Sequence, residues 1–150
     1  MASLYPTFEM PELVEQRQER PQPKYPKSYL FDFEKGDFVV DGAGRVVIAD
    51  GHTAWVQWCI KTILTERFAC LAYSWDYGVE VGGALRQPSR LAIEMEVERT
   101  ITEALLVDPR TEQVRDFTFR READQLWVSF VAVPVIGDAA RIEEVRVDAV

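Results

Sequence analysis

The chain has 150 residues and a mass of 17.2 kDa, enough for one domain with one hydrophobic core. Hydrophobic residues make up 47%, as in folded globular proteins. The formal net charge of −8, from 17 basic and 25 acidic residues, excludes sequence-independent nucleic-acid binding and docking on an anionic membrane surface. No apolar run is long enough to span a bilayer, and the N-terminus lacks a secretory signal pattern. We therefore expect a soluble, intracellular protein.

Residues 1–28 differ in composition from the rest of the chain, because they hold five of the eight prolines. The prolines at 21, 23 and 26 favour extended backbone and leave room only for a short helix over 11–20. We interpret this segment as an extended N-terminal arm, with a disordered tail as the alternative. Its apolar anchors are Leu4, Tyr5, Phe8, Met10 and Leu13.

The remaining residues, 29–150, form the predicted domain, and their first part is typical of strands. Tyr29, Phe31 and Phe33 recur with the period of two that a strand requires. Hydrophobic runs at 38–40 and 45–48 flank the sequence Asp-Gly-Ala-Gly, which predicts a hairpin with a four-residue turn.

A helix follows, capped by Asp50 or Thr53 and ending near Leu64. One face of it carries a stripe that we expect to enter the core, made of Trp55, Trp58, Cys59, Thr62 and Ile63.

His52 is the only histidine, and Cys59 and Cys70 are the only cysteines. This set is too small for a Cys/His zinc site, so we expect no metal and no cofactor. His52 and Cys59 share a helix face but lie about 10 Å apart along its axis, which is too far for one to activate the other. Both thiols are interpreted as small buried side chains.

The segment 65–83 is irregular and rich in aromatic residues, which we expect in the core, with glycines marking turns. A longer helix then runs from Pro88-Ser89 to Asp108-Pro109. Its core stripe comprises Ile93, Val97, Ile101, Ala104 and Leu105. Its glutamates at 94, 96, 98 and 103 are interpreted as a solvated face.

Strands return in the last forty residues. A strand over 114–119 and a turn over 120–125 precede the apolar run 126–135, which predicts a central strand covered on both sides. A turn at 136–138 leads to a final strand over 141–150. The order of elements predicts an α+β fold with a mostly antiparallel sheet, two main helices and the extended N-terminal arm.

Catalytic patterns are scarce. Glu66, near Trp75 and with Asp76 as its partner, could serve as the acid of a small cell-wall glycan hydrolase, since glycoside hydrolysis needs two carboxyl groups at a defined separation. Residues so close in sequence rarely point into one site, so this function is kept only as an alternative. A further alternative is a binding domain for a small molecule or peptide that uses the aromatic segment 68–77.

Three motifs occur in order: Gly-His-Thr-Ala-Trp-Val-Gln-Trp at 51–58, Thr-Glu-Arg-Phe at 65–68 and Tyr-Ser-Trp-Asp-Tyr-Gly at 73–78. Together they resemble the small sheath-initiator subunits of the baseplate wedge in contractile phage tails, a family found also in prophages and phage-tail-like bacteriocins. The family's Glu-Arg signature is matched by Glu66-Arg67 and its Tyr-Gly mark by Tyr77-Gly78. Residues 101–110 are similar to the ending of the family's long helix, and the likeness covers about 29–148.

The resemblance implies a structural subunit without enzymatic activity, in the baseplate of a virion or phage-tail-like particle assembled in the bacterial cytoplasm. Its implied partners are large wedge proteins, the tail sheath protein and hub or tube proteins. Neither nucleic acid nor a membrane is expected as a partner. In the family the Glu-Arg signature belongs to the interface between wedge subunits. The resemblance thus assigns a wedge interface to Glu66, Arg67, Tyr77 and Gly78. Some members of the family are described as lysozyme-like, and we do not extend that description to this chain.

Such subunits start the first sheath ring by strand exchange, in which backbone hydrogen bonds join strands of different chains. The C-terminal edge strand, 141–150, suits this role because it has charged neighbours that limit indiscriminate pairing. The expected sheath-contact residues are Ile142, Val145 and Val147. The alternative is that this strand only closes its own sheet.

Overall fold

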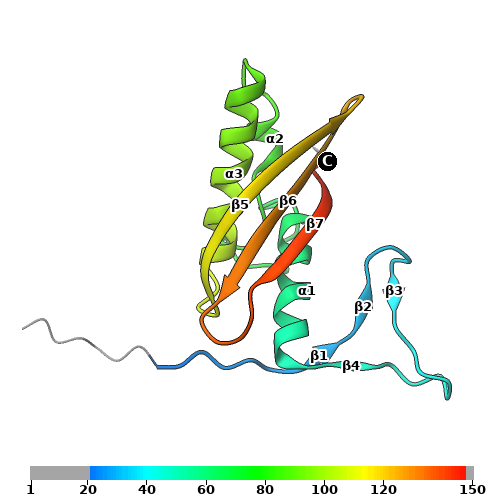
Figure 1. Ribbon diagram of the computed structural model, residues 1–150. Coiled ribbons are helices and arrows are strands. Elements are labelled where there is room, and N and C mark those ends of the chain that lie inside the picture. Colours follow the sequence, from blue (N-terminus) through cyan, green and yellow to red (C-terminus); the bar gives the residue numbers. More distant parts are fainter. Residues whose placement is uncertain (1–20, 148–150) are drawn as a thin grey trace, which may run out of the picture.

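The computed structural model describes residues 21–147 and has an α+β fold (Figure 1). Four short strands, β1 (Ser28–Tyr29), β2 (Phe31–Asp32), β3 (Asp37–Phe38) and β4 (Ile48–Ala49), precede the helices α1 (Gly51–Ile63), α2 (Val81–Ala84) and α3 (Arg90–Leu106). Three longer strands end the chain, β5 (Thr111–Glu122), β6 (Gln125–Pro134) and β7 (Ala140–Val147). The predicted fold class is confirmed. The predicted anchors and short helix within residues 1–20 lie outside the described residues, as do residues 148–150 of the C-terminal strand.

The four short strands form a lobe beside α1 (Figure 1). β1 pairs with β4 and β2 with β3, both antiparallel, and Val40 pairs with Val46 across the turn. The side chain of Asp41 accepts two backbone N–H groups of this turn, and Gly44 has a φ of +75°, which glycine adopts without strain. The predicted hairpin around 41–44 is confirmed.

Helix α1 begins after Asp50, whose carboxylate accepts the N–H of Thr53 at 2.7 Å, and has its C-cap at Leu64. These bounds confirm the predicted helix. The stripe faces the core as expected, except that Trp58 is only partly buried. The buried residues of the helix are Ala54, Trp55, Cys59, Thr62 and Ile63.

Residues 21–27 run along the base of α1, where Tyr25 fastens them (Figure 1). The Tyr25 hydroxyl donates to the Arg110 carbonyl at 3.1 Å and accepts the N–H of Ile136 at 3.3 Å. A Cβ at Gly51 would lie 2.4 Å from the Tyr25 carbonyl oxygen. Only glycine at the start of α1 therefore lets this segment pass so closely.

Helix α3 begins after Ser89, whose hydroxyl accepts the N–H of Ala92, and it ends at the predicted Asp-Pro pair. Its core stripe is confirmed, with Val97, Ile101, Ala104 and Leu105 buried. The predicted solvated glutamates carry surface ion pairs, from Arg90 to Glu94 and from Arg99 to both Glu96 and Glu103. Exposed pairs of this kind contribute little to stability individually.

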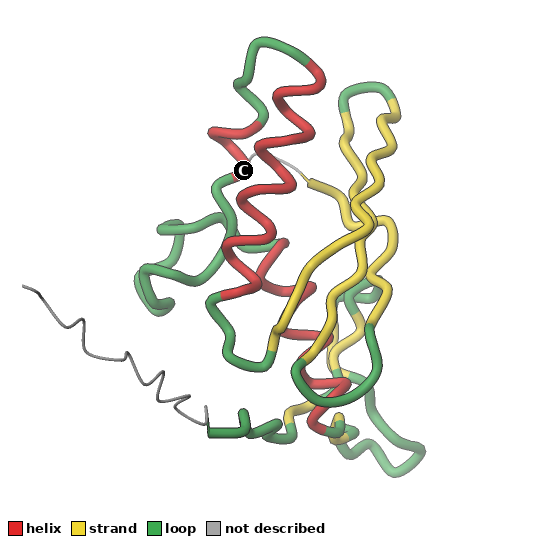
Figure 2. Tube along the Cα trace, turned by 60° about the vertical axis from the view of Figure 1, so that its left-hand side comes forward, coloured by secondary structure: helices red, strands yellow, loops and turns green. Residues whose placement is uncertain are grey.

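The long strands form one antiparallel sheet in the order β5-β6-β7, and the helices lie on one of its faces (Figure 2). Along β6, Leu126, Val128 and Phe130 are buried against the helices. The central position of β6 is confirmed, but the expectation that both its faces are covered is wrong. Trp127 and Val131 on the other face are only partly buried. Trp127 is partly covered by a long side chain of the neighbouring strand β5, since the guanidinium of Arg120 lies 5.5 Å from its ring.

Both edge strands of this sheet are bulged. The pairing of β5 with β6 shifts between Arg115 and Thr118, where Asp116 has a φ of +59°. The pairing of β7 with β6 shifts beside Glu144, which has a φ of +51° and donates its N–H to the Ser129 hydroxyl at 2.9 Å. Such bulges twist an edge and interrupt its regular row of backbone groups. The turn between β5 and β6 is also tighter than the predicted 120–125, because β5 continues to Glu122.

Candidate functional site

The segment between α1 and α2 turns back on itself and brings the two motifs of the predicted wedge interface together. Glu66 and Val79 form a parallel bridge. The Arg67 N–H donates to the Val79 carbonyl at 2.9 Å, and the Val79 N–H donates to the Thr65 carbonyl at 2.9 Å. Glu66-Arg67 and Tyr77-Gly78 therefore lie side by side, although nine residues separate them in sequence.

Gly78 permits this close approach. Its φ is +96°, and a Cβ there would lie 2.6 Å from the Thr65 carbonyl oxygen and 3.1 Å from the Arg67 nitrogen. Any other residue needs both a strained backbone and a displacement of the neighbouring segment 65–67. Gly78 is thus a structural requirement of the loop.

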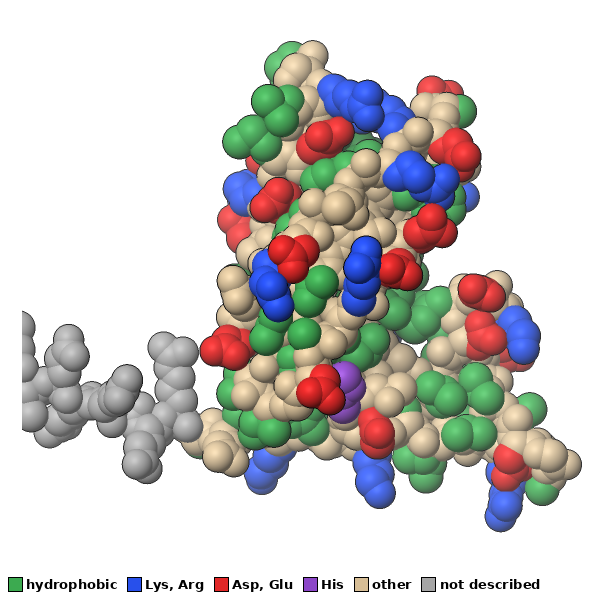
Figure 3. All heavy atoms as spheres, viewed as in Figure 1, with side chains coloured by type: hydrophobic (Ala, Val, Ile, Leu, Met, Phe, Trp, Pro, Cys, Tyr) green, Lys and Arg blue, Asp and Glu red, His purple; other side chains and the backbone are tan. Residues whose placement is uncertain are grey.

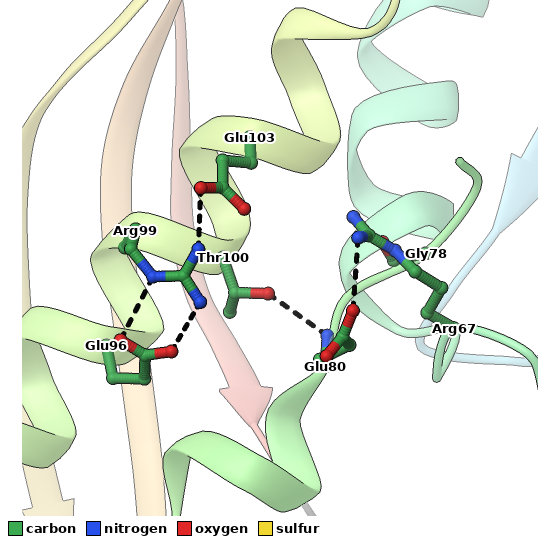
Figure 4. A network of polar contacts seen from close by, with 7 residues as sticks. All are labelled: Arg67, Gly78, Glu80, Glu96, Arg99, Thr100 and Glu103. Atoms are coloured by element: carbon green, nitrogen blue, oxygen red, sulfur yellow. Dashed lines mark hydrogen bonds and ion pairs between the residues drawn. The ribbon is translucent and has the colours of Figure 1, made fainter. Parts of the chain in front are cut away.

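Arg67 is the centre of a polar network that joins this loop to α3 (Figure 4). Its Nη1 lies 3.2 Å from Glu80 Oε1, and its Nε donates to the Gly78 carbonyl at 3.2 Å. The backbone N–H of Glu80 in turn donates to the Thr100 hydroxyl at 3.1 Å. The Arg67 side chain is only 16% exposed, so the pair with Glu80 is partly shielded from water. Glu80 was missed from the sequence, where nothing marks it as the partner of Arg67.

Glu66 points elsewhere. Its Oε1 would lie 3.6 Å from a Cβ at Gly82, which places the carboxylate beside α2. Asp76, the second carboxylate of the alternative hydrolase, is exposed in the loop. Within residues 21–147 no hydrogen bond joins Glu66 to Asp76 or to Arg67. The loop therefore does not pair the two carboxylates.

Tyr77 packs between aromatic neighbours on the inner side of the loop. Its ring centroid is 6.1 Å from that of Trp58 and 4.6 Å from that of Tyr73. Burial raises the pKa of the Tyr77 hydroxyl above its ordinary value. Tyr77 therefore stays neutral and holds the loop against α1.

The outer part of the same loop contradicts the expectation that its aromatic residues belong to the core. Phe68 is 59% exposed and Trp75 is 80% exposed, and their rings lie 5.7 Å apart. Leu71 between them is fully exposed. Phe68 and Trp75 contact each other, and no helix or sheet in the described part of the chain covers the three side chains. They leave an apolar surface next to the Glu-Arg signature.

The predicted sheath-contact residues occupy the inner side of β7. Ile142, Val145 and Val147 are all buried in the core, at 3, 7 and 3% exposure. Their side chains therefore close the chain's own sheet. β7 is nevertheless an edge strand, and exposed charged residues alternate with the buried ones. Figure 3 shows acidic and basic side chains interspersed over this face of the sheet.

Arg110 joins several segments below the loop, and sequence reasoning gave it no role of its own. Its Nε and Nη2 contact the Asp108 carboxylate at 2.9 and 2.5 Å, and its guanidinium lies 5.8 Å from the Trp58 ring. The hydrogen bond to Asp108 raises the pKa of Arg110, which stays charged. Its carbonyl accepts bonds from Tyr25 and Val135. The only sequence feature that drew attention to Arg110 was the Asp-Pro-Arg motif at 108–110.

No helix within residues 21–147 combines the length and the apolar composition that a membrane span requires. The described residues form a small α+β scaffold with an exposed edge strand and a loop that carries exposed apolar side chains. The chain belongs to the family of contractile injection system sheath initiators, whose sequence pattern matches residues 27–134. It is 32% identical over 121 residues to the phage-like element PBSX protein XkdS of Bacillus subtilis (strain 168), an alignment that covers 79% of this chain and 81% of that relative.

Family membership confirms the resemblance drawn from the three motifs. The chain is therefore a structural component of a contractile tail, in a phage or phage-like particle, where it interacts with other tail components.

Proposed function

We propose that this chain is a subunit of the baseplate wedge that joins wedge proteins to hub or tube proteins and nucleates sheath polymerisation by strand exchange. The observation that carries the proposal is the position of β7, an edge strand formed by the last described residues. An edge strand offers backbone N–H and C=O groups to a strand of another chain. The charged side chains Arg141 and Glu143 beside that edge favour selective pairing over aggregation.

In this proposal the interface with the large wedge proteins is formed by Glu66, Arg67, Tyr77 and Gly78. Arg67 and Gly78 give the loop its shape, and the Glu66 carboxylate supplies a charge next to α2. The neighbouring exposed aromatic residues add the apolar area that protein interfaces bury. The interface thus combines a fixed backbone with side chains that are costly to leave in water.

Hydrogen exchange tests the strand-exchange step directly. The full chain is mixed with the sheath protein of the same particle, and exchange is followed by mass spectrometry. We expect added protection in peptides from residues 139–147, since strand pairing engages amides that now face water. Protection that rises on β5, the opposite edge, and leaves β7 unchanged contradicts the proposal.

Deletion of residues 138–150 is a poor test, because it removes the buried side chains of Ile142, Val145 and Val147 along with the edge. A proline scan over the exposed positions Arg141, Glu143 and Arg146 is sharper, because proline removes one backbone donor. Melting temperatures identify the variants that keep the fold. We expect at least one folded variant to stop sheath assembly, whereas normal sheaths on every folded variant argue against strand exchange at β7.

We further propose that the chain has no enzymatic activity. The glycan hydrolase needs two carboxyl groups on either side of one bond, about 5–10 Å apart, but Glu66 lies beside α2 and Asp76 is exposed in the loop. A zymogram of cell-wall glycan compares the natural chain with its Glu66→Gln variant. We expect no clearing by either, and clearing that only the natural chain produces supports the hydrolase.

A further inference from the structure

A groove of about 700 Å³ separates the β1–β4 lobe from α1. Most of its wall is aromatic or aliphatic, and its size is in the range of protein ligand sites. Figure 3 shows hydrophobic side chains gathered over this lobe. The principal apolar lining residues are Tyr29, Phe31, Phe33, Phe38, Trp58 and Leu64.

The charge of the groove is opposite to that of the chain. Among residues 21–147, its ionisable lining residues are Lys27, Lys61 and Arg110, together with the tyrosine at its rim, and none of the carboxylates in this range lines it. The chain as a whole has 25 acidic and 17 basic residues. Arg110 is already paired with Asp108, so Lys27 and Lys61 are the cations available to a ligand. A hydrogen bond to Tyr73 raises the pKa of Lys61, which keeps this ammonium charged. The groove therefore attracts carboxylates.

The backbone of the lobe is already satisfied where it meets α1. Gln57 accepts the N–H of Phe31 at 2.7 Å and donates to the Tyr29 carbonyl at 3.0 Å. These two backbone groups are thus not free to pair with an added strand. A ligand is recognised here through apolar contacts and charge, which differs from the strand exchange proposed at β7.

The shape of the groove favours a chain over an enclosed small molecule. Tyr29 and Phe38 stand at its rim, 59 and 49% exposed, with their ring centroids 6.3 Å apart. Lys61, which also lines the groove, has its ammonium 5.0 Å from the centroid of the Tyr73 ring in the neighbouring loop. Exposed aromatic side chains that lie together, as Tyr29 and Phe38 do, are typical of a protein-binding surface.

We propose that this groove binds an extended segment of another tail protein in which aromatic or aliphatic side chains alternate with carboxylates. The apolar side chains enter between the lobe and α1, and the carboxylates pair with Lys27 and Lys61. The tail origin of the partner rests on the proposed function, whereas its chemistry rests on the lining of the groove.

The test uses overlapping 15-residue peptides that cover the sheath, tube and wedge proteins of the same particle, and also residues 1–20 of this chain. The full chain is titrated with each peptide and binding is followed by fluorescence anisotropy. We expect a peptide of the stated composition to bind and to lose about tenfold in affinity with the double variant Lys27→Glu/Lys61→Glu. The matched control, Lys24→Glu, reverses an exposed charge outside the groove and leaves binding unchanged.

A second pair of variants measures the contribution of apolar contacts to peptide binding separately from that of charge. Tyr29→Ala removes a side chain at the rim and is expected to weaken binding of the same peptide. Val46→Ala, which changes an exposed residue of the lobe outside the groove, is expected to leave binding unchanged. Three results overturn the proposal: no peptide depends on the groove, the bound peptides lack carboxylates, or only residues 1–20 of this chain bind. Because none of these variants alters β7, sheath assembly on them reports separately on the proposed function.

Discussion

The guanidinium of Arg67 lies 3.2 Å from the carboxylate of Glu80, thirteen residues further along the chain, and not against its neighbour Glu66. The two residues of the Glu-Arg signature therefore have different surroundings. Arg67 is built into the loop, whereas Glu66 lies beside α2 and makes no hydrogen bond through its side chain within the described chain. Substitutions at Arg67 and at Glu66 can therefore distinguish an effect on the stability of the fold from an effect on wedge assembly.

We expect Arg67→Ala to lower the free energy of unfolding by about 1–2 kcal/mol, because it removes the partly shielded ion pair and the bond to the Gly78 carbonyl. Glu66→Ala is expected to change stability by less than about 0.5 kcal/mol and yet to impair wedge assembly. Urea unfolding and assembly of wedge complexes measure the two effects. Equal loss of stability in both variants means that Glu66 also acts within the fold.

Gly78→Ala is expected to destabilise the chain by about 2 kcal/mol or more, because a Cβ would lie 2.6 Å from the Thr65 carbonyl at a φ of +96°. Gly83→Ala is the matched control. A Cβ there meets nothing within 4 Å, and alanine favours helix. Thermal unfolding compares the two variants, and similar melting temperatures contradict the role assigned to Gly78.

Removal of the Tyr25 hydroxyl is expected to cost about 1–2 kcal/mol, since it leaves the Arg110 carbonyl and the Ile136 N–H each without one hydrogen bond. Tyr25→Phe keeps the ring and isolates this effect. Tyr29→Phe, at an exposed tyrosine of the lobe, is the control and should unfold like the natural chain. If both variants match the natural chain in urea, residues 21–27 are not fastened by Tyr25.

The two cysteines are expected to react differently. Burial raises the pKa of the Cys59 thiol from 9.0 to about 12, whereas Cys70 is exposed, so the interpretation of both thiols as buried is wrong for Cys70. Iodoacetamide at pH 8 should therefore label one thiol in the native chain and two after unfolding, counted by mass spectrometry. The raised pKa also makes Cys59 favour the folded state below pH 9, a contribution lost as the pH rises toward 12. Rapid double labelling of the native chain contradicts this burial.

The two main helices, α1 and α3, could be predicted because their signals are local, whereas the short α2 (Val81–Ala84) lies where an irregular segment was expected. Asp50 and Ser89 cap the helices with their own side chains, and the apolar stripes repeat at the helical period. The hairpin turn at 41–44 was equally local. The two motifs Glu66-Arg67 and Tyr77-Gly78 also proved to lie side by side, since Glu66 forms a bridge with Val79.

What the sequence could not supply depends on contacts between distant segments. Nothing adjacent to Arg67 indicates that Glu80 is its partner, and nothing near Tyr25 indicates Arg110. The aromatic residues of 68–75 read as core by composition alone, and their exposure follows from the absence of a covering element in the described residues. The prediction that both faces of β6 are covered by other elements was wrong for a related reason. On the outer face, the side chain of Arg120 from the neighbouring strand covers Trp127, and no second layer does so in the described residues.

The bulge at Glu144 limits what β7 can offer to a neighbour. It separates the regularly paired residues 140–142 from 145–147, so a straight strand laid along this edge matches one short stretch and loses register at the other. A single such contact is weak and easily reversed. Several chains held in a fixed array multiply it, because each bound strand raises the effective concentration of the next. Sheath growth that depends on β7 would therefore begin on an assembled array and not on free subunits.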